Sequence, residues 1–441
     1  MRSRWLFITI ALTLFFGAVA AFAVLTLQAK PYRDAASLLP LEMAAARAEG
    51  LPLTPEEAFV RQVPESANAA PTIVKAIDEL QKVKDHRTLI ESASKLILEG
   101  KPKEALVKLE PLAPALRLVE SAREFQELEF ERNWSNPIET PFPEFSHIKD
   151  LVKAKGFQAE AFAATGRPAE AMDALVSGAH LSSLLRHERT LIGMLVRIAC
   201  EAIVGRSAER VADIWARDGM WLERLQNLAR SGFGPDPDFI QSLTGEVIYG
   251  IYAPKDLDAI EKFAATDGFM GDGVKVPRIP GLDRKVQSQA YQTRALQFWR
   301  RAFGAMEPHR KDPLRASQVL GALSEREAAN RAPTYELNAI VLPVFDQAGT
   351  AVVRLQARRL LLETKVRVLR YRLRTGKFPE KLSEAGIEVV DPFNRKPLRY
   401  VREAGGFKIW SVDVDIEDDG GQVGPQANTG DIVMFYPFRP K

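Results

Sequence analysis

Cysteine is nearly absent from the sequence: Cys200 is the only one, so no disulfide bond can form within the chain. It lies in an apolar helical stretch, LVRIACEAIV, where a buried thiol is usually inert. The net charge is also small, at +3 over 441 residues. So small an excess excludes a molecule whose whole surface attracts polyanions, and we expect no nucleic-acid partner.

Motifs with a known chemical mechanism are absent as well. The sequence contains no Gly-x-x-x-x-Gly-Lys phosphate loop, no Gly-x-Ser-x-Gly elbow and no dinucleotide glycine pattern after a strand. His180 and His187 lie two helical turns apart, too far to bind one zinc ion without further ligands. We interpret all the histidines as core or surface residues: His86, His147, His180, His187 and His309. The sequence therefore offers no catalytic or cofactor-binding candidate.

One long apolar run is present, at the N-terminus. Residues Trp5 to Leu27 carry no charge, and the run is longer than the roughly 20 residues that a helix needs to cross a membrane. Arg2 and Arg4 before it favour a cytoplasmic N-terminus, although Lys30 and Arg33 on the far side weaken this bias.

The alternative is a cleaved signal peptide, which would release a secreted protein. Ala18-Val19-Ala20 and Ala21-Phe22-Ala23 both place small residues where such a peptide is cut. The apolar run continues past both sites, which favours an uncleaved anchor. We therefore predict a transmembrane signal anchor over residues 1–28, with the remainder of the chain outside the cytoplasm.

The pattern of the remaining chain changes twice. Residues 29–64 are predicted to form a juxtamembrane connector, in which Thr54 caps a helix that starts at Pro55. Residues 65–340 have helical periodicity and are predicted to form an irregular α-helical domain. Residues 341–441 begin with a long helix and continue as short β-prone runs between turn formers.

Two helical hairpins are predicted in the helical domain. Gly100 and Gly166 each open a Gly-x-Pro-x-Glu-Ala turn between two helical segments, and the alanines permit close antiparallel packing. The second hairpin resembles a tetratricopeptide repeat at Ala159, Phe162, Gly166, Ala171, Leu175 and Gly178. Because a free-standing solenoid needs about three repeats, we expect an irregular domain with hairpins of this kind rather than an array.

The helix predicted over residues 351–377 is strongly basic, with Glu363 as its only acid. We interpret it as a packed helix whose arginines lie over its flanks. The alternative is contact with acidic lipids or an acidic partner.

The C-terminal segment resembles the C-terminal domain of type II secretion major pseudopilins. The matching residues are Tyr371, Gly376, Phe378, Pro379, Leu382, Asp391, Pro392, Pro397 and Tyr400. Independently, turn chemistry predicts that Gly376 ends the helix and that strands follow at 398–402, 407–412 and 432–436. The resemblance covers only this end of the chain. The first apolar segment lacks the glutamate and processing site of pseudopilins, so polymerisation does not follow from it.

Members of that family bind calcium before the last strand, which makes calcium the one cofactor that the resemblance implies. Oxygen donors in a Gly-rich loop suit this ion. The spacing is not that of an EF-hand, because Asp418 stands where glycine is needed and Gly424 where glutamate is needed. The candidate ligands are Asp413, Asp415, Asp418, Asp419 and Asp431.

The sequence thus predicts a mainly α protein with an N-terminal transmembrane helix and a small C-terminal α+β module with a three-stranded antiparallel sheet. The segments ESANAAP, GRPAEAMDAL, RTLIGMLVRIAC and DPFNRKPLRY resemble uncharacterised bacterial membrane-anchored proteins, which implies the bacterial inner membrane but no activity. We expect a structural or protein-interaction role at the cell envelope with a protein partner. The alternative is an extracytoplasmic hydrolase or metal-dependent enzyme whose site is assembled from distant residues.

Overall fold

The structure is a computed structural model that describes residues 23–137, 140–258, 276–330, 332–335, 346–424 and 429–438. It is 67% helical with a small three-stranded antiparallel sheet, which confirms the predicted fold class at this level. Residues 23–37 are helical, whereas most of the predicted anchor, residues 1–22, lies outside the described residues. Within the described part, no helix combines the length and apolarity needed to cross a membrane.

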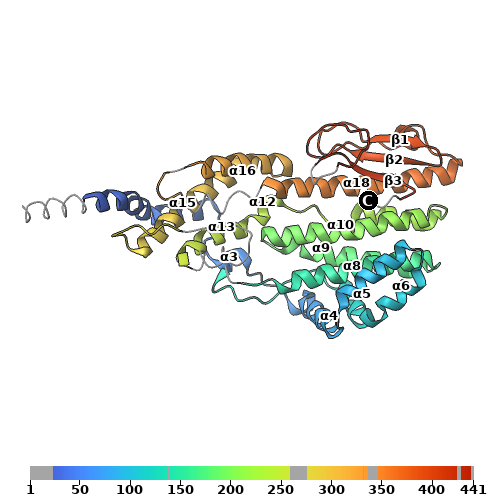
Figure 1. Ribbon diagram of the computed structural model, residues 1–441, viewed down its shortest axis with the longest axis horizontal. Coiled ribbons are helices and arrows are strands. Elements are labelled where there is room, and N and C mark those ends of the chain that lie inside the picture. Colours follow the sequence, from blue (N-terminus) through green and yellow to red (C-terminus); the bar gives the residue numbers. More distant parts are fainter. Residues whose placement is uncertain are drawn as a thin grey trace, which may run out of the picture.

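Helices form successive layers, with the sheet on one long side of the molecule (Figure 1). Beneath the sheet lie first α18, then α9 and α10, then α8, and on the opposite side α4 to α6 (Figure 1). The helices are α2 (Leu39–Ala48), α3 (Pro55–Phe59), α4 (Ala70–Lys82), α5 (His86–Leu98), α6 (Pro102–Leu109), α7 (Ala113–Ser121), α8 (Pro143–Ala164), α9 (Pro168–Leu184), α10 (Leu191–Ile214), α11 (Gly219–Asn227), α12 (Phe239–Ser242), α13 (Thr244–Tyr252), α15 (Arg284–Met306), α16 (Pro313–Ala328) and α18 (Asp346–Thr375).

Both predicted hairpins are present, as α5–α6 and α8–α9. Gly100 and Gly166 each have φ = +75°, a left-handed conformation that glycine adopts without strain, and each reverses the chain between its two helices. A proline then occupies the first position of the second helix, where its missing N–H is not needed. The predicted cap at Thr54 is also confirmed, since its hydroxyl accepts a hydrogen bond from the Glu57 amide at 3.3 Å.

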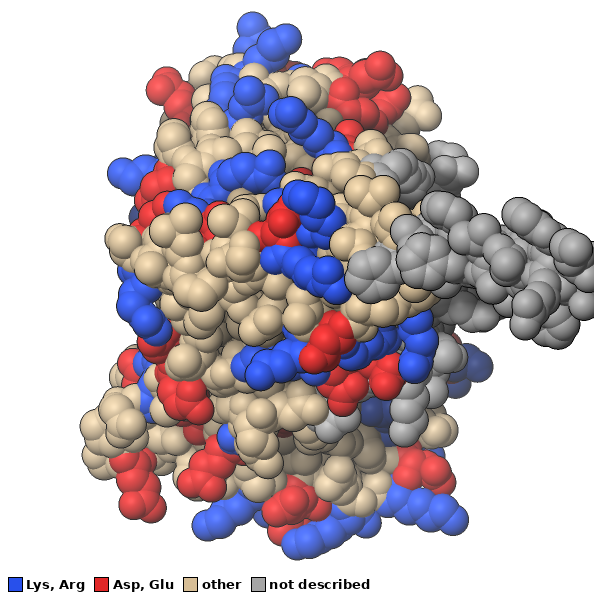
Figure 2. Space-filling view, turned by 90° about the vertical axis from the view of Figure 1, so that its left-hand side faces the viewer, with Lys and Arg blue, Asp and Glu red and all other residues tan. Residues whose placement is uncertain are grey.

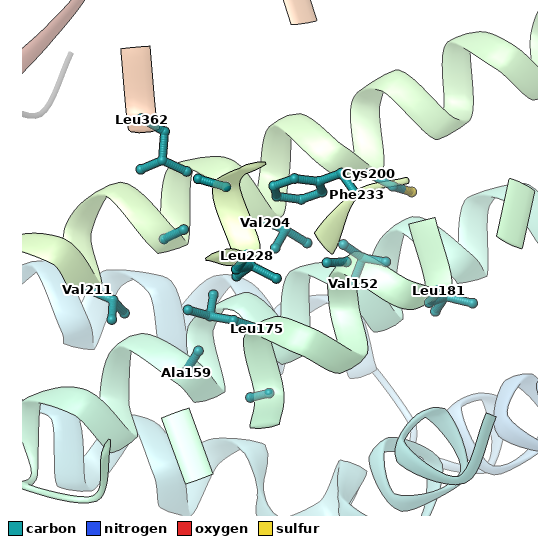
Figure 3. Packing of buried hydrophobic residues seen from close by; sticks show 14 of the residues in the cluster. Val152, Ala159, Leu175, Leu181, Cys200, Val204, Val211, Leu228, Phe233 and Leu362 are labelled. Atoms are coloured by element: carbon teal, nitrogen blue, oxygen red, sulfur yellow. The ribbon is translucent and has the colours of Figure 1, made fainter. Parts of the chain in front are cut away.

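The largest hydrophobic cluster runs through α4 to α11, α18 and the sheet. Figure 3 shows its centre, where Cys200 and Val204 of α10 lie near Leu175 of α9 and Val152 of α8. Burial in this cluster raises the pKa of Cys200 to about 12, in agreement with an inert thiol. A second cluster joins α2 to α10, α12, α13, α15, α16 and the start of α18.

The basic helix α18 is packed, as predicted, but on more than one side. It contacts α10, α11, α16 and the sheet, and consecutive residues from Leu361 to Leu369 are largely buried. Its arginines are half-buried apart from the exposed Arg374, whereas Lys365 lies within the fold. Arg354 bonds to Asp413 at 2.7 Å, and Lys365, which is fully buried, bonds to Asp213 at 2.7 Å.

The strands are β1 (Arg399–Glu403), β2 (Gly406–Ser411) and β3 (Ile432–Tyr436), in the order β1-β2-β3. They agree with the predicted strands to within one residue. Gly376 has φ = +78° and ends α18, as predicted. Buried Asp391 holds the module together: its carboxylate accepts hydrogen bonds from the Phe393 and Val412 amides and from the Ser411 hydroxyl.

The end of the molecule where α2 and α15 lie has both signs of charge intermixed (Figure 2). Arg300 of α15 bonds there to Glu42 and Glu49 of α2. This face therefore presents no extended patch of one sign.

Candidate functional site

A pocket lies where the helical body meets the C-terminal module. Its walls come from α10, α18 and β3, and its cavity volume is about 170 Å³. A cavity of ~150 Å³ holds a benzene ring, so this space suits one side chain or a group of similar size. Its apolar lining includes Phe233, Leu355, Leu362, Met434 and Phe438.

Buried ion pairs fix the three walls relative to one another. Lys365 of α18 bonds to Asp213 of α10 at 2.7 Å and donates to the Phe435 carbonyl of β3 at 2.8 Å. Its ammonium also lies 3.7 Å from Glu209. Burial raises the pKa of Asp213 and Glu209 more than the attraction of Lys365 lowers it.

A second buried network closes another side of the pocket. Glu201 of α10 accepts a hydrogen bond from Arg197 at 2.9 Å and is also bonded to Arg359 of α18. Arg359 reaches Asp236 at 2.8 Å as well. Burial raises the pKa of Glu201, and the two guanidinium groups oppose that rise. The walls are therefore held in place by charge pairs in a largely dry environment.

Positive charge remains in the pocket after these pairs are made. Among the described residues, neither Arg206 of α10 nor Arg358 of α18 makes a hydrogen bond or ion pair, and both line the pocket. Burial lowers the pKa of the Arg358 guanidinium, and the nearby Arg206 lowers it further. The Nε atoms of Arg210 and Arg359, also in lining residues, are buried without a partner in that same part of the chain.

The edge strand β3 borders the pocket, and its residues there are buried or half-buried. β3 pairs only with β2 within the described residues, and Ile432, Val433, Met434 and Phe435 line the cavity. Backbone groups along a strand point alternately to its two sides. Because the Phe435 carbonyl points at Lys365, the polar groups of Val433, two residues away, point to that side as well. An extended chain could add to this edge as a further strand.

The five aspartates that the pseudopilin resemblance proposes as calcium ligands have different hydrogen-bond and ion-pair partners. Asp413 bonds to Arg354 of α18. Asp418 bonds to Arg399 at 2.8 Å and accepts from the Trp410 indole at 2.9 Å. Asp431 accepts from the Gly421 amide, and burial together with Asp418 and Asp419 raises its pKa to about 6.

Within the described ranges, Asp415 accepts a hydrogen bond from the Glu417 amide two residues on and from no other group. Asp431 and Asp419 are thus close enough to interact, whereas Asp413 and Asp418 already neutralise arginines. Calcium binding by this loop stays a prediction.

One cluster that the sequence reasoning missed joins two histidines to a carboxylate. His86 at the start of α5 lies beside His147 and Asp150 of α8, and the ligand atoms of the three residues are all within 4.8 Å of one another. The spacing of His147 and Asp150, three positions apart on one helix, is the signal that could have been noticed. His86 comes from another helix, and only the tertiary fold adds it.

Comparison of the chain with family models, curated proteins and solved structures finds no match. The function must therefore be argued from these sites.

Proposed function

We propose that this protein is a membrane-tethered binding module whose ligand is an extended peptide carrying an apolar side chain and a carboxylate. The single observation that carries this proposal is the pocket between α10, α18 and β3, where the guanidinium groups of Arg206 and Arg358 have no hydrogen-bond or ion-pair partner among the described residues. Arg206 is exposed, whereas burial lowers the pKa of Arg358 and makes its charge costly. A ligand carboxylate bonded to Arg358 removes that cost.

The shape of the pocket supports a peptide rather than a free anion. Its volume, about 170 Å³, admits one apolar side chain, and the edge of β3 offers backbone groups to a neighbouring extended chain. The buried ion pairs of Lys365 and Glu201 hold the walls before any ligand arrives. Preorganisation of this kind lowers the entropy lost on binding.

The membrane tether in this proposal rests on the uncharged run from Trp5 to Leu27. Extraction of cell membranes at alkaline pH tests it: the full chain should stay with the membrane, and a chain that starts at residue 29 should be released. A fused reporter at Lys441 that is active only in the cytoplasm should be silent. An active reporter would reject the proposed topology.

The binding role is tested by site-specific photocrosslinking in the cells that make the protein. A photoreactive benzoylphenylalanine replaces Gly205 of α10, which lines the pocket and where an added Cβ atom meets nothing within 4 Å. The matched control places the same group at Gly304 of α15, which has equal space but lies in a different pocket. We expect a discrete protein adduct from position 205 and none from position 304.

Charge dependence then separates the proposed ligand from a chance neighbour. Arg206→Gln together with Arg358→Gln should reduce the adduct at position 205 at least about tenfold, because a charge-assisted hydrogen bond contributes about 1.5–3 kcal/mol. Arg310→Gln, far from this pocket, should leave it unchanged. Equal adducts at both positions, or an adduct that survives the double substitution, would show that the pocket is not the binding site.

A further inference from the structure

The cluster of His86, His147 and Asp150 is independent of the peptide pocket and lies on the other side of the helical body, between α5 and α8. Two of its ring nitrogens, Nε2 of His86 and Nδ1 of His147, are buried and have no hydrogen-bond partner among the described residues. Buried polar atoms are normally paired, so two orphaned acceptors or donors beside one carboxylate call for an explanation.

The geometry is close to that of a three-ligand metal site. Two ligands bound at ~2.0–2.1 Å to a tetrahedral zinc ion are about 3.4 Å apart. Nε2 of His86 is 3.7 Å from the nearer oxygen of Asp150, and no pair in the cluster exceeds 4.8 Å. Side-chain rotations that draw the atoms in by roughly 1 Å would complete the site.

The second ring nitrogen of His147 already has a hydrogen-bond partner. The other ring nitrogen of His147, Nε2, lies 2.9 Å from the side-chain amide of Gln81 on α4. Metal-bound histidines almost always bond through their second nitrogen, which fixes the tautomer and the orientation of the ring. The Gln81 atom at this distance is the amide nitrogen, which donates to Nε2 and leaves the ring proton on Nδ1. A half-turn of the amide brings Oε1 to the same place. Oε1 then accepts from Nε2–H, and the Nδ1 lone pair of His147 becomes free to bind a metal ion.

Two neighbouring cations pair with Asp150, Lys153 at 3.8 Å from Oδ1 and Arg87 at the other oxygen, and Arg87 is the closer competitor of an ion. Arg87 donates from Nε to Asp150 at 2.8 Å, at the oxygen that faces His86. The Arg87 side chain is 58% exposed and can turn into solvent, whereas the Asp150 side chain is 8% exposed and cannot leave the cluster. Arg87 therefore sets the affinity of the site by occupying Asp150 when no ion is bound.

We propose that His86, His147 and Asp150 form a binding site for a divalent transition-metal ion, with zinc as the best fit. Two imidazoles and one carboxylate suit zinc and not magnesium or calcium, which prefer oxygen ligands. Three protein ligands leave a fourth position for water or a small anion. His147 and Gln81 also line a pocket of about 460 Å³ between α4, α8 and the segment around Arg132, which gives such a ligand room.

The test is a Co²⁺ titration of the full chain, purified without a histidine tag and stripped of metal with a chelator. We expect the absorption bands of tetrahedral Co²⁺, one equivalent bound, and displacement by Zn²⁺ but not by millimolar Mg²⁺. His86→Gln and His147→Gln should each lower affinity more than about 100-fold, and Gln81→Leu about 10–100-fold. His309→Gln is the matched control and should bind as the wild type does.

Arg87→Gln keeps the proposal testable if a histidine variant fails to fold. Removing the guanidinium from Asp150 should tighten Co²⁺ binding, and because Arg87 is exposed the variant should remain folded. The proposal is wrong if wild-type protein shows no tetrahedral Co²⁺ spectrum. It is equally wrong if folded His86→Gln binds as tightly as wild type, or if Arg87→Gln weakens binding.

Discussion

Removal of the Lys365 ammonium should destabilise the protein strongly, because this buried charge joins α10, α18 and β3. Lys365 is fully buried, and its partners Asp213 and Glu209 have side chains that are 15% and 12% exposed. Lys365→Met keeps most of the volume and leaves Asp213 and Glu209 without an ion-pair partner among the described residues. Breaking a buried pair in this way costs about 3–5 kcal/mol.

The expected shift in melting temperature follows from the size of the chain. Unfolding entropy of ~2.1 cal/mol/K per residue gives about 0.9 kcal/mol/K for a chain of 441 residues. A loss of about 3–5 kcal/mol then lowers Tm by roughly 3–5 °C. The α18 residues belong to the largest hydrophobic cluster, so we expect one cooperative transition rather than early loss of the sheet.

The stability that Lys365→Met loses should increase with pH. Burial raises the pKa of Asp213 and Glu209, and Lys365 opposes that rise, so both pKa values rise further in Lys365→Met. A carboxyl group with a raised pKa in the folded state retains its proton where the unfolded chain has lost it. Stability of the variant therefore falls as pH rises from about 4 through the folded pKa, and the deficit is larger at pH 8 than at pH 5.

Calorimetry of wild type, Lys365→Met, Asp213→Asn and the double variant completes the test. The double variant should be more stable than Lys365→Met alone, because it no longer buries the uncompensated Asp213 charge. The proposed role of Lys365 would be refuted if Lys365→Met had the Tm of the wild type. It would also be refuted if the stability lost in the double variant were the sum of the losses in the two single variants.

Three further predictions concern single positions. Asp391→Ala should lower the free energy of unfolding by about 3–5 kcal/mol and speed hydrogen exchange of the Val412 amide. It removes a buried carboxylate that accepts three hydrogen bonds and pairs with Arg399. Asp391→Asn should lower the free energy of unfolding less. Gly166→Ala should lower the free energy of unfolding by about 1 kcal/mol, measured by urea denaturation, because φ is +75° there. Gly304→Ala in the last turn of α15 should raise it by about 0.5–1 kcal/mol. If the aspartate loop binds calcium, calcium should raise the Tm of wild type and not that of Asp431→Asn, and an unchanged wild-type Tm with calcium and with chelator would reject that site.

Local patterns predicted those parts of the fold that local chemistry determines. The two hairpins follow from a glycine in the left-handed region and a proline at the next helix start, both readable from sequence. β3 was predicted within its observed bounds because turn formers delimit an apolar run. The ionic core was not predictable. Lys365 and Glu209 are 156 positions apart, and α18 appeared to be an amphipathic helix with exposed cations.

The candidate sites escaped sequence reasoning for the same reason. Arg206 and Arg358 become a site only because the other nearby cations are paired, and no local pattern shows which arginines have partners. His86 and His147 were interpreted separately as core or surface residues, which is correct for each helix alone. The two histidines lie side by side only because α5 packs against α8.

Helix α8 carries one ligand of the metal cluster and contacts a residue of the peptide pocket, yet the structure favours independent action of the two sites. Asp150 of the metal cluster lies on α8, and Glu160 on the same helix bonds to Arg210, which lines the peptide pocket. Proximity through one helix is not coupling, which requires an element with two arrangements that both ligands bias. Glu160 is buried and held by Ser207 at 2.7 Å and Arg210 at 2.8 Å, so it has no evident second arrangement. Saturating Zn²⁺ should therefore leave the crosslinking yield at position 205 unchanged, and a change of threefold or more would show that α8 transmits a signal between the sites.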